Sequence, residues 1–376
     1  MNEFFKIIIY GSYGKGNFGD DLLMISVIRL LSKKIPISHL SVTAHPKQAY
    51  IQKWFSTINT IDVFKPKKRN VDLFIFGGGT QMFHFQEQKK SGVLNLIKKM
   101  YRFSISLYYA RESDGTFKAI RYNRSLAISI GIGPFIKGSK IKQKTIKWLK
   151  DCAWIGLRDN VALEFCNVNN INNTNLYSDL IFNKCLWSNE LKNPNHNSTC
   201  LKNISIVIRD WNYDTDSKGY IVKLLDASKQ LQKMGYKIKF ISFAETIDSD
   251  SILKIKKSCF HIRSWQPEKM TVNNFIDDVF RGVDLVVSAR AHGLIVASSL
   301  EIPSFAIEIE PKLKIINMQI NGCSPIWSPP FLPSDFVSII LKLSSRWEKV
   351  RGAMVKNSGK LARKATKMAN EFIENV

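Results

Sequence analysis

Short apolar runs recur along the chain, and most are followed by a segment whose apolar residues have helical spacing. The runs occupy residues 6–10, 39–44, 72–76, 125–130, 154–157, 204–208, 284–288 and 304–309. Their length and apolar character are typical of buried parallel strands, whereas residues 292–300 have helical spacing with small side chains. Alternating strands and helices predict parallel sheets covered by helices on both faces, which is an α/β fold.

An asparagine-rich, polar stretch at residues 167–200 interrupts this alternation and is the best candidate for a linker. We therefore predict two Rossmann-like domains facing across a cleft, an architecture similar to that of the B-type glycosyltransferases. We place the first domain at residues 1–185 and the second at 200–335, followed by basic C-terminal helices at 336–376. With 376 residues the chain is long enough for both domains.

The loops after the predicted strands are rich in glycine and arginine. The first strand is followed by residues 11–21, GSYGKGNFGDD, and the third by the glycine triplet 77–79. Arg158 and Arg209 each follow a further strand. Ligands of open α/β sheets bind outside the carboxyl ends of the strands, so these loops mark the predicted binding side.

The most specific set of candidate functional residues follows the runs 284–288 and 304–309. Arg290 and His292 stand between a strand and a helix, and Lys312 follows the next strand. A helix N-terminus adds amide donors and a positive dipole end, which favour an anion. A single Arg-x-His is more often ordinary surface chemistry, but its recurrence with other strand-end cations predicts a phosphate or carboxylate site beside a proton-transfer group.

Composition narrows the class of protein. Hydrophobic residues make up 45% and charged residues 23% of the chain, as in globular proteins, and no apolar run approaches the roughly 20 residues that span a bilayer. The N-terminus is not a convincing signal peptide, so we predict a cytoplasmic protein. The six cysteines lack CxxC spacing and indicate neither a disulfide framework nor a zinc site.

The formal net charge of +24 implies a polyanionic partner. No nucleic-acid-binding signature is present, so nucleic acid is not expected. Residues 136–150 and 341–376 are basic and amphipathic, a pattern that favours peripheral attachment to an anionic membrane surface. The competing interpretation is a pair of packed surface helices in a lysine-rich protein, and the sequence leaves both open.

The glycine loop at 14–19 formally fits GxGxxG, the fingerprint of dinucleotide binding. Dinucleotide binding also needs an acidic residue at the end of the second strand to hold the ribose. His45 and Pro46 stand at that position, so we reject this interpretation. A Walker A loop is excluded because the loop ends in Gly-Asp-Asp. A two-domain glycosyltransferase that uses a nucleotide sugar stays open as the alternative function, although nothing marks a base pocket.

The combination of 11–21, FGGGT (76–80), GLRD (156–159), ARAHGLIVAS (289–298) and EPK (310–312) resembles the bacterial polysaccharide pyruvyltransferases. The resemblance runs from about residue 7 to 315. It implies transfer of pyruvate from phosphoenolpyruvate to a sugar, as a ketal, in the assembly of capsule, exopolysaccharide or another surface polymer. The chain departs from the common pattern at Ala291, where the family has leucine, and at Ile309-Glu310, where it has Tyr-Asp.

The resemblance and the residue chemistry together assign roles. His292 is the predicted general acid/base, because the pKa of histidine lies nearest neutrality. Arg158, Arg290 and Lys312 are expected to clamp the donor, and no metal or cofactor is required if they neutralise the phosphate. Asp20, on the first helix of the N-terminal domain, is either a base for the sugar hydroxyl or the N-cap of that helix. Further predicted substrate contacts are Gly14, Asn17, Gly77, Gly78, Gly79, Arg209 and Glu310, and the expected acceptor is a lipid-linked glycan.

Overall fold

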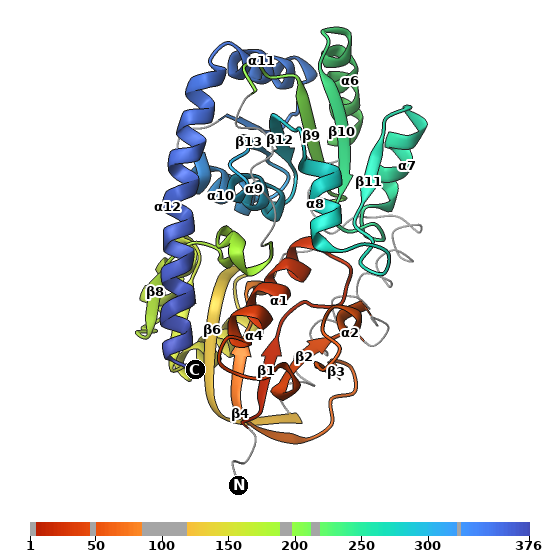
Figure 1. The fold of residues 1–376 in the computed structure, drawn as a ribbon. Coiled ribbons are helices and arrows are strands. Elements are labelled where there is room, and N and C mark those ends of the chain that lie inside the picture. The colour runs from red at the N-terminus through yellow and green to blue at the C-terminus, as the bar shows by residue number, and fades with distance from the viewer. Residues whose placement is uncertain (1–4, 46–49, 85–118, 189–197, 212–218, 322–324) are drawn as a thin grey trace, which may run out of the picture. The chain divides into compact units, whose positions relative to one another are not determined.

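The computed structural model describes residues 5–45, 50–84, 119–188, 198–211, 219–321 and 325–376 (Figure 1). The chain divides into two compact units, each with its own sheet. Unit 1 comprises Met1–Lys15, Val27–Asn175 and Asn375–Val376, and unit 2 comprises Gly16–Ser26 and Leu176–Glu374. The first nine residues of the helix that follows the first strand therefore belong to unit 2.

Unit 1 is built on an eight-stranded sheet whose paired strands are parallel. Its order is β3-β2-β1-β4-β6-β7-β8, with β5 also paired to β6. The strands are β1 (Ile7–Tyr10), β2 (Leu40–Ala44), β3 (Asn59–Asp62), β4 (Arg69–Phe76), β5 (Gly79–His84), β6 (Ile120–Phe135), β7 (Trp154–Leu157) and β8 (Thr174–Leu176). The order reverses between β1 and β4, which is the switch point where doubly wound sheets bind ligands.

The helices of this half of the sequence are α1 (Phe18–Leu31), η1 (Ile37–His39), α2 (Tyr50–Trp54), α4 (Lys140–Lys150) and α5 (Asn160–Val168). A core of side chains from β4, β6, β7 and α5 fills the space beside the sheet. Phe74 and Phe76 lie in this core and are fully buried. Burial on both faces explains why these strands read as continuous apolar runs.

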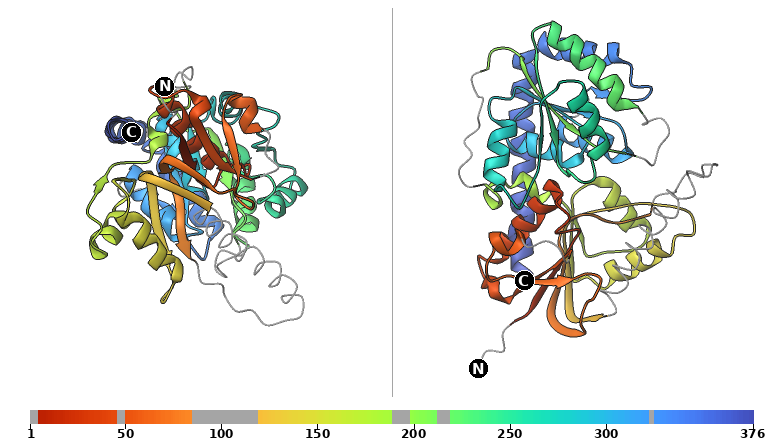
Figure 2. Two further views of the ribbon diagram at one scale, coloured as in Figure 1. Left: turned by 90° about the horizontal axis from the view of Figure 1, so that it is seen from below. Right: turned by 90° about the vertical axis from the view of Figure 1, so that its right-hand side faces the viewer.

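Unit 2 repeats the same topology with a six-stranded parallel sheet in the order β11-β10-β9-β12-β13-β14. The strands are β9 (Asn203–Ile208), β10 (Lys237–Ser242), β11 (Ile262–Ser264), β12 (Leu285–Ser288), β13 (Ser304–Ile307) and β14 (Ile326–Trp327). The helices are η2 (Leu180–Phe182), η3 (Lys184–Leu186), α6 (Tyr220–Lys233), α7 (Ser249–Lys257), α8 (Val272–Phe280), α9 (Ala291–Ser299), α10 (Pro311–Asn321), α11 (Pro333–Ser344) and α12 (Trp347–Glu374). Helices cover both faces of the sheet, and its switch point lies between β9 and β12 (Figure 2).

One predicted strand is much longer than its apolar run. The run 125–130 lies inside β6, which extends from Ile120 to Phe135, so residues 131–134, with the sequence GIGP, continue the strand. β4 pairs with the first half of β6 and β5 with the second half. Ser129 has a φ of 55°, and the register against β7 shifts between Ala127 and Ile130. The irregularity therefore falls where the pairing of β6 passes from β4 to β5.

The predicted linker region also differs from expectation. The boundary between the units falls after Asn175 rather than near residue 185, and residues 189–197 lie outside the described part. Leu180, Phe182 and Trp187 are buried within the polar stretch. These apolar side chains make residues 176–188 a packed part of unit 2 instead of a linker.

The two basic segments are packed helices. In α12 the apolar residues are buried, among them Met354, Leu361 and Met368, and the helix contacts η2, α9 and α10 within unit 2. In α4, which begins at Lys140 and is capped by Ser139, Leu149 is buried and Trp148 packs against the core of unit 1. The predicted apolar stripes therefore face the protein interior. In the described residues, no helix combines the length and apolarity that crossing a membrane requires.

Candidate functional site

The strand ends of unit 2 gather most of the predicted cations at one edge. β9, β12 and β13 are consecutive neighbours in the sheet. Arg209 follows β9, Arg290 stands between β12 and α9, and Glu310 and Lys312 follow β13 at the start of α10. Because the strands are parallel, their carboxyl ends lie on the same edge, at the switch point. These residues therefore follow neighbouring strands of one sheet, and their roles in a site stay predictions.

Arg290 forms the centre of a buried network. Its Nη2 lies 2.5 Å from Asp248 Oδ1, and its Nε donates to the carbonyl of Ile208 at 3.2 Å. Asp248 is fully buried and also accepts from Ser242 Oγ (2.7 Å) and from the backbone N–H of Asp210 (3.1 Å). The Arg290 guanidinium thus joins the ends of β9, β10 and β12. Its predicted role as a donor clamp stays a prediction.

Asp248 had no place in the sequence-based site, although it follows β10 at the same edge. Asp210, beside it, accepts from the backbone N–H of Asp250 (3.0 Å) and Ser251 (3.2 Å) at the start of α7. Burial raises the pKa of Asp210 above the ordinary aspartate value, against the hydrogen bonds from Ser251 and Asp250. The signal available from the sequence was an acidic cluster after an apolar strand, and only the fold pairs it with Arg290.

Arg209 and Lys312 converge on one carboxylate. Arg209 Nη1 lies 2.5 Å and Lys312 Nζ 3.1 Å from Glu310 Oε1. Burial alone would raise the pKa of Glu310, but the charges of Arg209, Lys312 and Arg290 outweigh it, so this pKa lies below the ordinary glutamate value. Glu310 Oε2 is buried and has no hydrogen-bond partner within the described residues. Two of its neighbours keep access to solvent, because 21% of the Arg209 side chain and 33% of that of Lys312 are exposed.

The ring of Trp211 supports Arg209 from the other side. The guanidinium carbon lies 4.4 Å from the ring centroid, within the range of a cation–π interaction. The Arg209 backbone N–H donates to the Tyr220 hydroxyl at 3.0 Å, and this hydroxyl donates back to the Arg209 carbonyl at 2.7 Å. Arg209 is therefore held at both its backbone and its side chain, and its predicted role in substrate binding stays a prediction.

His292 is the second residue of α9, is half-buried, and packs against the first turn of α1. A Cβ built on Gly19 would lie 2.6 Å from His292 Cβ and closer still to the ring atoms Cγ and Nδ1. Gly16–Ser26 belongs to unit 2, so this contact lies within one unit. The sequence predicted both segments as functional but gave no sign that they touch.

Asp20 lies on the same turn of α1. The N-cap interpretation is wrong, because α1 begins at Phe18 and Asp20 is its third residue. Asp20 Oδ2 accepts from Asn17 Nδ2 at 2.7 Å, and both residues are half-buried. Asn17 and Asp20 thus form a polar pair next to the Gly19–His292 contact, in the same unit as Arg290 and Lys312 rather than in the N-terminal domain.

In unit 1, the glycine loops after β1 and β4 are packed around Tyr13. Its hydroxyl donates to the carbonyl of Gly77, and its ring occupies the space where Gly11 would carry a side chain. A Cβ on Gly77 would meet this hydroxyl and would lie 2.7 Å from Ile9 Cγ2. Gly77 is therefore explained by close packing. Its neighbours Gly78 and Gly79 have φ values of 90° and 83°. Substrate binding stays a prediction for these three glycines and for Gly14.

Arg158 follows β7 in unit 1 and is almost completely buried. Its Nη2 donates to Thr80 Oγ1 at 2.6 Å, and its Nε lies 3.6 Å from Asp159. A Cβ on Gly131 would lie only 2.8 Å from this Nε, so the GIGP glycine makes room for the guanidinium. Asp159 also caps α5 by accepting from the N–H of Ala162 at 2.8 Å. Arg158 is thus held at the carboxyl edge of its own sheet, and its donor role stays a prediction.

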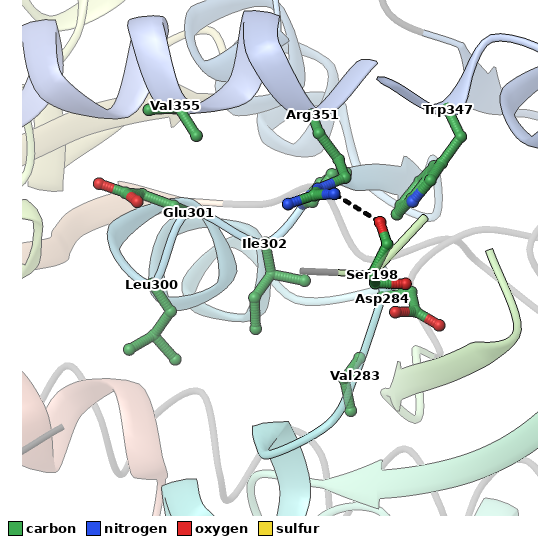
Figure 3. A pocket seen from close by; sticks show the side chains of 10 residues that line it. Ser198, Val283, Asp284, Leu300, Glu301, Ile302, Trp347, Arg351 and Val355 are labelled. Atoms are coloured by element: carbon green, nitrogen blue, oxygen red, sulfur yellow. Dashed lines mark hydrogen bonds between the residues drawn. The ribbon is translucent and has the colours of Figure 1, made fainter. Parts of the chain in front are cut away.

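A small pocket lies at the other end of the unit 2 sheet (Figure 3). Val283 and Asp284 before β12, residues 300–303 before β13, and Trp347 and Arg351 of α12 line it. Its volume of about 30 Å³ holds little more than a water molecule. The indole N–H of Trp347 is buried there with no acceptor among the residues that the structure describes. The pocket is too small for a sugar or a phosphorylated donor.

A family model described as "Polysaccharide pyruvyl transferase" matches residues 17–311. No curated protein matches the chain at a significant level.

Solved structures share the fold at low sequence identity. Anabaena Alr3699/HepE in complex with UDP and glucose is 9% identical, covers 99% of each chain and has a TM-score of 0.56. A putative UDP-N-acetylglucosamine 2-epimerase from Listeria monocytogenes is 8% identical, covers 99% of this chain and 96% of its own, and has a TM-score of 0.58. These matches confirm the predicted α/β class with two Rossmann-like domains, and they bear on the fold alone.

Proposed function

The chain belongs to the polysaccharide pyruvyl transferase family, and we propose that it transfers pyruvate from phosphoenolpyruvate to a sugar as a ketal. The family makes it a transferase that acts on a polysaccharide. The donor, the ketal product and the lipid-linked acceptor are the parts that we propose. The observation that carries the donor assignment is the pair of partly exposed cations, Arg209 and Lys312, at the switch point beside α9.

Phosphoenolpyruvate bears a phosphate and a carboxylate on a three-carbon skeleton, so it needs several fixed cations. Arg209 and Lys312 already share one anion, the Glu310 carboxylate, and their nitrogen atoms lie 2.5 and 3.1 Å from the same oxygen. A phosphate or carboxylate that approaches from solvent would meet both side chains. The N-terminus of α9, which begins at Ala291, adds a positive dipole end at the same edge.

The proposed reaction balances with groups of this chain. His292 delivers a proton to the methylene carbon of the donor, which becomes a methyl group, and a sugar hydroxyl attacks the neighbouring carbon and loses its proton. The C–O bond to phosphate then breaks, and Arg209 and Lys312 stabilise the departing phosphate. A second hydroxyl of the sugar attacks the same carbon and loses its proton, which closes the ketal. Of the two hydroxyl protons, one restores the proton that His292 delivered, and Asp20 is the proposed acceptor of the other, which leaves with the phosphate.

The experiment that tests this function follows phosphate release and the mass of the glycan. The protein is incubated with phosphoenolpyruvate and lipid-linked glycans, and we expect one phosphate released for each pyruvate added to the glycan. Thermal unfolding provides an independent measurement of donor choice. Phosphoenolpyruvate should raise Tm without divalent metal, whereas UDP-sugars and NAD should not. A larger Tm increase with a UDP- or GDP-sugar would instead assign the chain to nucleotide-sugar glycosyl transfer.

We also propose that an anionic membrane holds the protein near a lipid-linked acceptor. The apolar side of α12 is buried, so attraction would rest on its exposed lysines and not on insertion. Lys349, Lys356, Lys360 and Lys367 are exposed and lie on the side of the helix opposite its buried residues. Each cation held near such a surface contributes about 1 kcal/mol, and salt weakens the attraction.

Liposome co-sedimentation across a salt series tests this location. Lys356→Glu with Lys360→Glu should lower binding to anionic vesicles. The matched control, Lys229→Glu with Lys233→Glu on α6, changes the net charge equally but elsewhere on unit 2. Binding that does not depend on lipid charge, or an equal loss in the control, would contradict α12 as the contact surface.

A further inference from the structure

We propose that Gly19 is a positioning residue that fixes the imidazole of His292 through direct backbone contact. The inference rests on the proposed function, in which His292 moves a proton to the donor. It assigns to Gly19 a role that the GxGxxG pattern does not predict, because glycines of this pattern are usually interpreted as phosphate-binding residues. Here its last glycine, Gly19, faces a side chain of the same unit.

The geometry leaves no room for a side chain at position 19. The three atoms nearest to a Cβ built on Gly19 all belong to His292: Nδ1, Cγ and Cβ, the last at 2.6 Å. Real Cβ atoms essentially never come this close to another heavy atom, and the crowded atoms include the root of the side chain and not only its tip. The imidazole therefore lies against the helix backbone of α1, and a methyl group at position 19 would displace it.

The first turn of α1 is itself held rigidly in unit 2. Phe18 is fully buried among Phe243, Trp265 and Phe275, with ring centroids 4.8, 5.0 and 4.8 Å away. Its backbone N–H donates to the Phe243 carbonyl at 2.9 Å. These contacts fix the position of the first turn of α1, and therefore the position of the Gly19 backbone against His292.

A second anchor lies one residue after Asp20. Asp21 is fully buried, and its Oδ2 accepts from the indole N–H of Trp265 at 2.8 Å. The opposite partner, α9, is fixed as well, because Ser358 Oγ of α12 donates to the Ser298 carbonyl at 2.6 Å. The Gly19–His292 contact thus joins two restrained helices, so the ring has little freedom to rotate. A proton-transfer group needs this restraint, since a misplacement of about 1 Å can cost about 100-fold in rate.

The test compares Gly19→Ala with Gly352→Ala, a substitution of the same kind inside α12, where a new Cβ meets nothing within 4 Å. We expect Gly19→Ala to lower kcat about 100-fold, with donor KM changed less than about threefold, because Arg209 and Lys312 are untouched. Gly352→Ala should keep wild-type kcat. In NMR spectra, the imidazole signal of His292, assigned by its loss in His292→Gly, should shift in Gly19→Ala and not in the control.

A double-mutant cycle tests the contact without any substrate. Gly19→Ala should lower Tm in the wild-type background and lower it much less in His292→Gly, where all three crowded atoms are gone. If the wild-type protein releases no phosphate from phosphoenolpyruvate, the proposed function fails, while this cycle and the NMR shift still decide the contact.

Two results would overturn the positioning role: a folded Gly19→Ala protein with wild-type kcat, or equal Tm losses in both backgrounds. If Gly19→Ala does not fold, Trp265→Phe replaces it in the kinetic test, because it removes the hydrogen bond to Asp21 and part of the ring that packs on Phe18. We then expect a roughly tenfold lower kcat at unchanged donor KM. Wild-type kcat in that variant would contradict the proposal.

Discussion

At the switch point of unit 1, the loops after β1 and β4 close around the ring of Tyr13, whereas at the equivalent point of unit 2 the loops after β9 and β12 carry Arg209 and Arg290. In both sheets the strand order reverses at this point, between β1 and β4 in unit 1 and between β9 and β12 in unit 2, so the difference here lies in the residues of the loops. Unit 1 uses glycine to admit its own side chain, and unit 2 uses buried carboxylates to hold cations in place. The two sheets place loops at equivalent positions, and the residues of these loops determine whether the position holds a packed side chain or charged groups.

The largest expected effect lies in unit 2. His292→Ala should lower kcat by about 10²- to 10⁴-fold, the usual contribution of a general acid, and Lys312→Ala should lower kcat/KM with a clear rise in donor KM. The control is His261→Ala, at an exposed histidine of the same unit. Steady-state kinetics with phosphoenolpyruvate measure all three variants. Near-normal turnover in His292→Ala would transfer the role of the acid to Asp20 or Glu310.

The buried ion pair gives the next largest effect, on stability. Arg290→Ala leaves the fully buried Asp248 carboxyl without its cationic partner, and breaking a buried pair costs about 3–5 kcal/mol. The matched control is Arg281→Ala, whose pair with Asp277 is exposed on both sides and screened by solvent, so its loss should change stability far less. Urea unfolding compares the two losses. Similar values would mean that the Arg290 network holds the strand ends less firmly than its burial indicates.

In unit 1 we expect a smaller effect, confined to stability. Tyr13→Phe removes the hydrogen bond to the Gly77 carbonyl and keeps the ring, so it should lower the free energy of unfolding by about 1 kcal/mol. The donor KM should not change if this loop is packing alone. A rise in donor KM at unchanged stability would show instead that the loop after β1 takes part in donor binding.

The pH dependence of stability should have opposite signs at two carboxylates of unit 2. The pKa of Glu310 is lowered by folding, so its contribution is complete above the ordinary glutamate pKa of about 4.3 and is lost as pH falls through the folded value. The pKa of Asp210 is raised, so its contribution is present below about 3.9 and is lost as pH rises through the folded value. Urea titrations of Glu310→Gln and Asp210→Asn from pH 3 to pH 7 measure both. If the difference in unfolding free energy between variant and wild type changed with pH in the same direction for both variants, these directions would be contradicted.

Local patterns predicted the elements that matter most. β7 has the bounds of its apolar run, and the run 284–288 differs from β12 by one residue. The sequence predicted that Arg209, Arg290 and Lys312 each follow a strand, and the strand order β9-β12-β13, which the structure supplies, puts these strand ends side by side. Arg158, predicted in the same group, lies in unit 1, and the roles of all four residues stay predictions.

The remaining features depend on contacts between residues far apart in the chain. Asp248 pairs with Arg290 across 42 positions, and Tyr13 reaches Gly77 across 64. The spacing of apolar residues within a helix or strand does not predict such long-range contacts. The basic amphipathic pattern of α12 was ambiguous for a related reason: an apolar stripe has the same spacing whether it faces lipid or the protein core, and only the fold shows Met354 and Leu361 buried.

The membership of Gly16–Ser26 in unit 2 constrains how the chain is made. Trp265 leaves the ribosome 244 residues after Asp21, its hydrogen-bond partner, and at about 5–20 residues per second that delay is roughly 12–50 seconds. Until Phe243 has been made, the apolar side chain of Phe18 has none of its three aromatic neighbours, so a nascent N-terminal half exposes an apolar surface. Chaperone binding to ribosome-bound chains should therefore persist until translation has passed Phe275, the last member of the aromatic cluster.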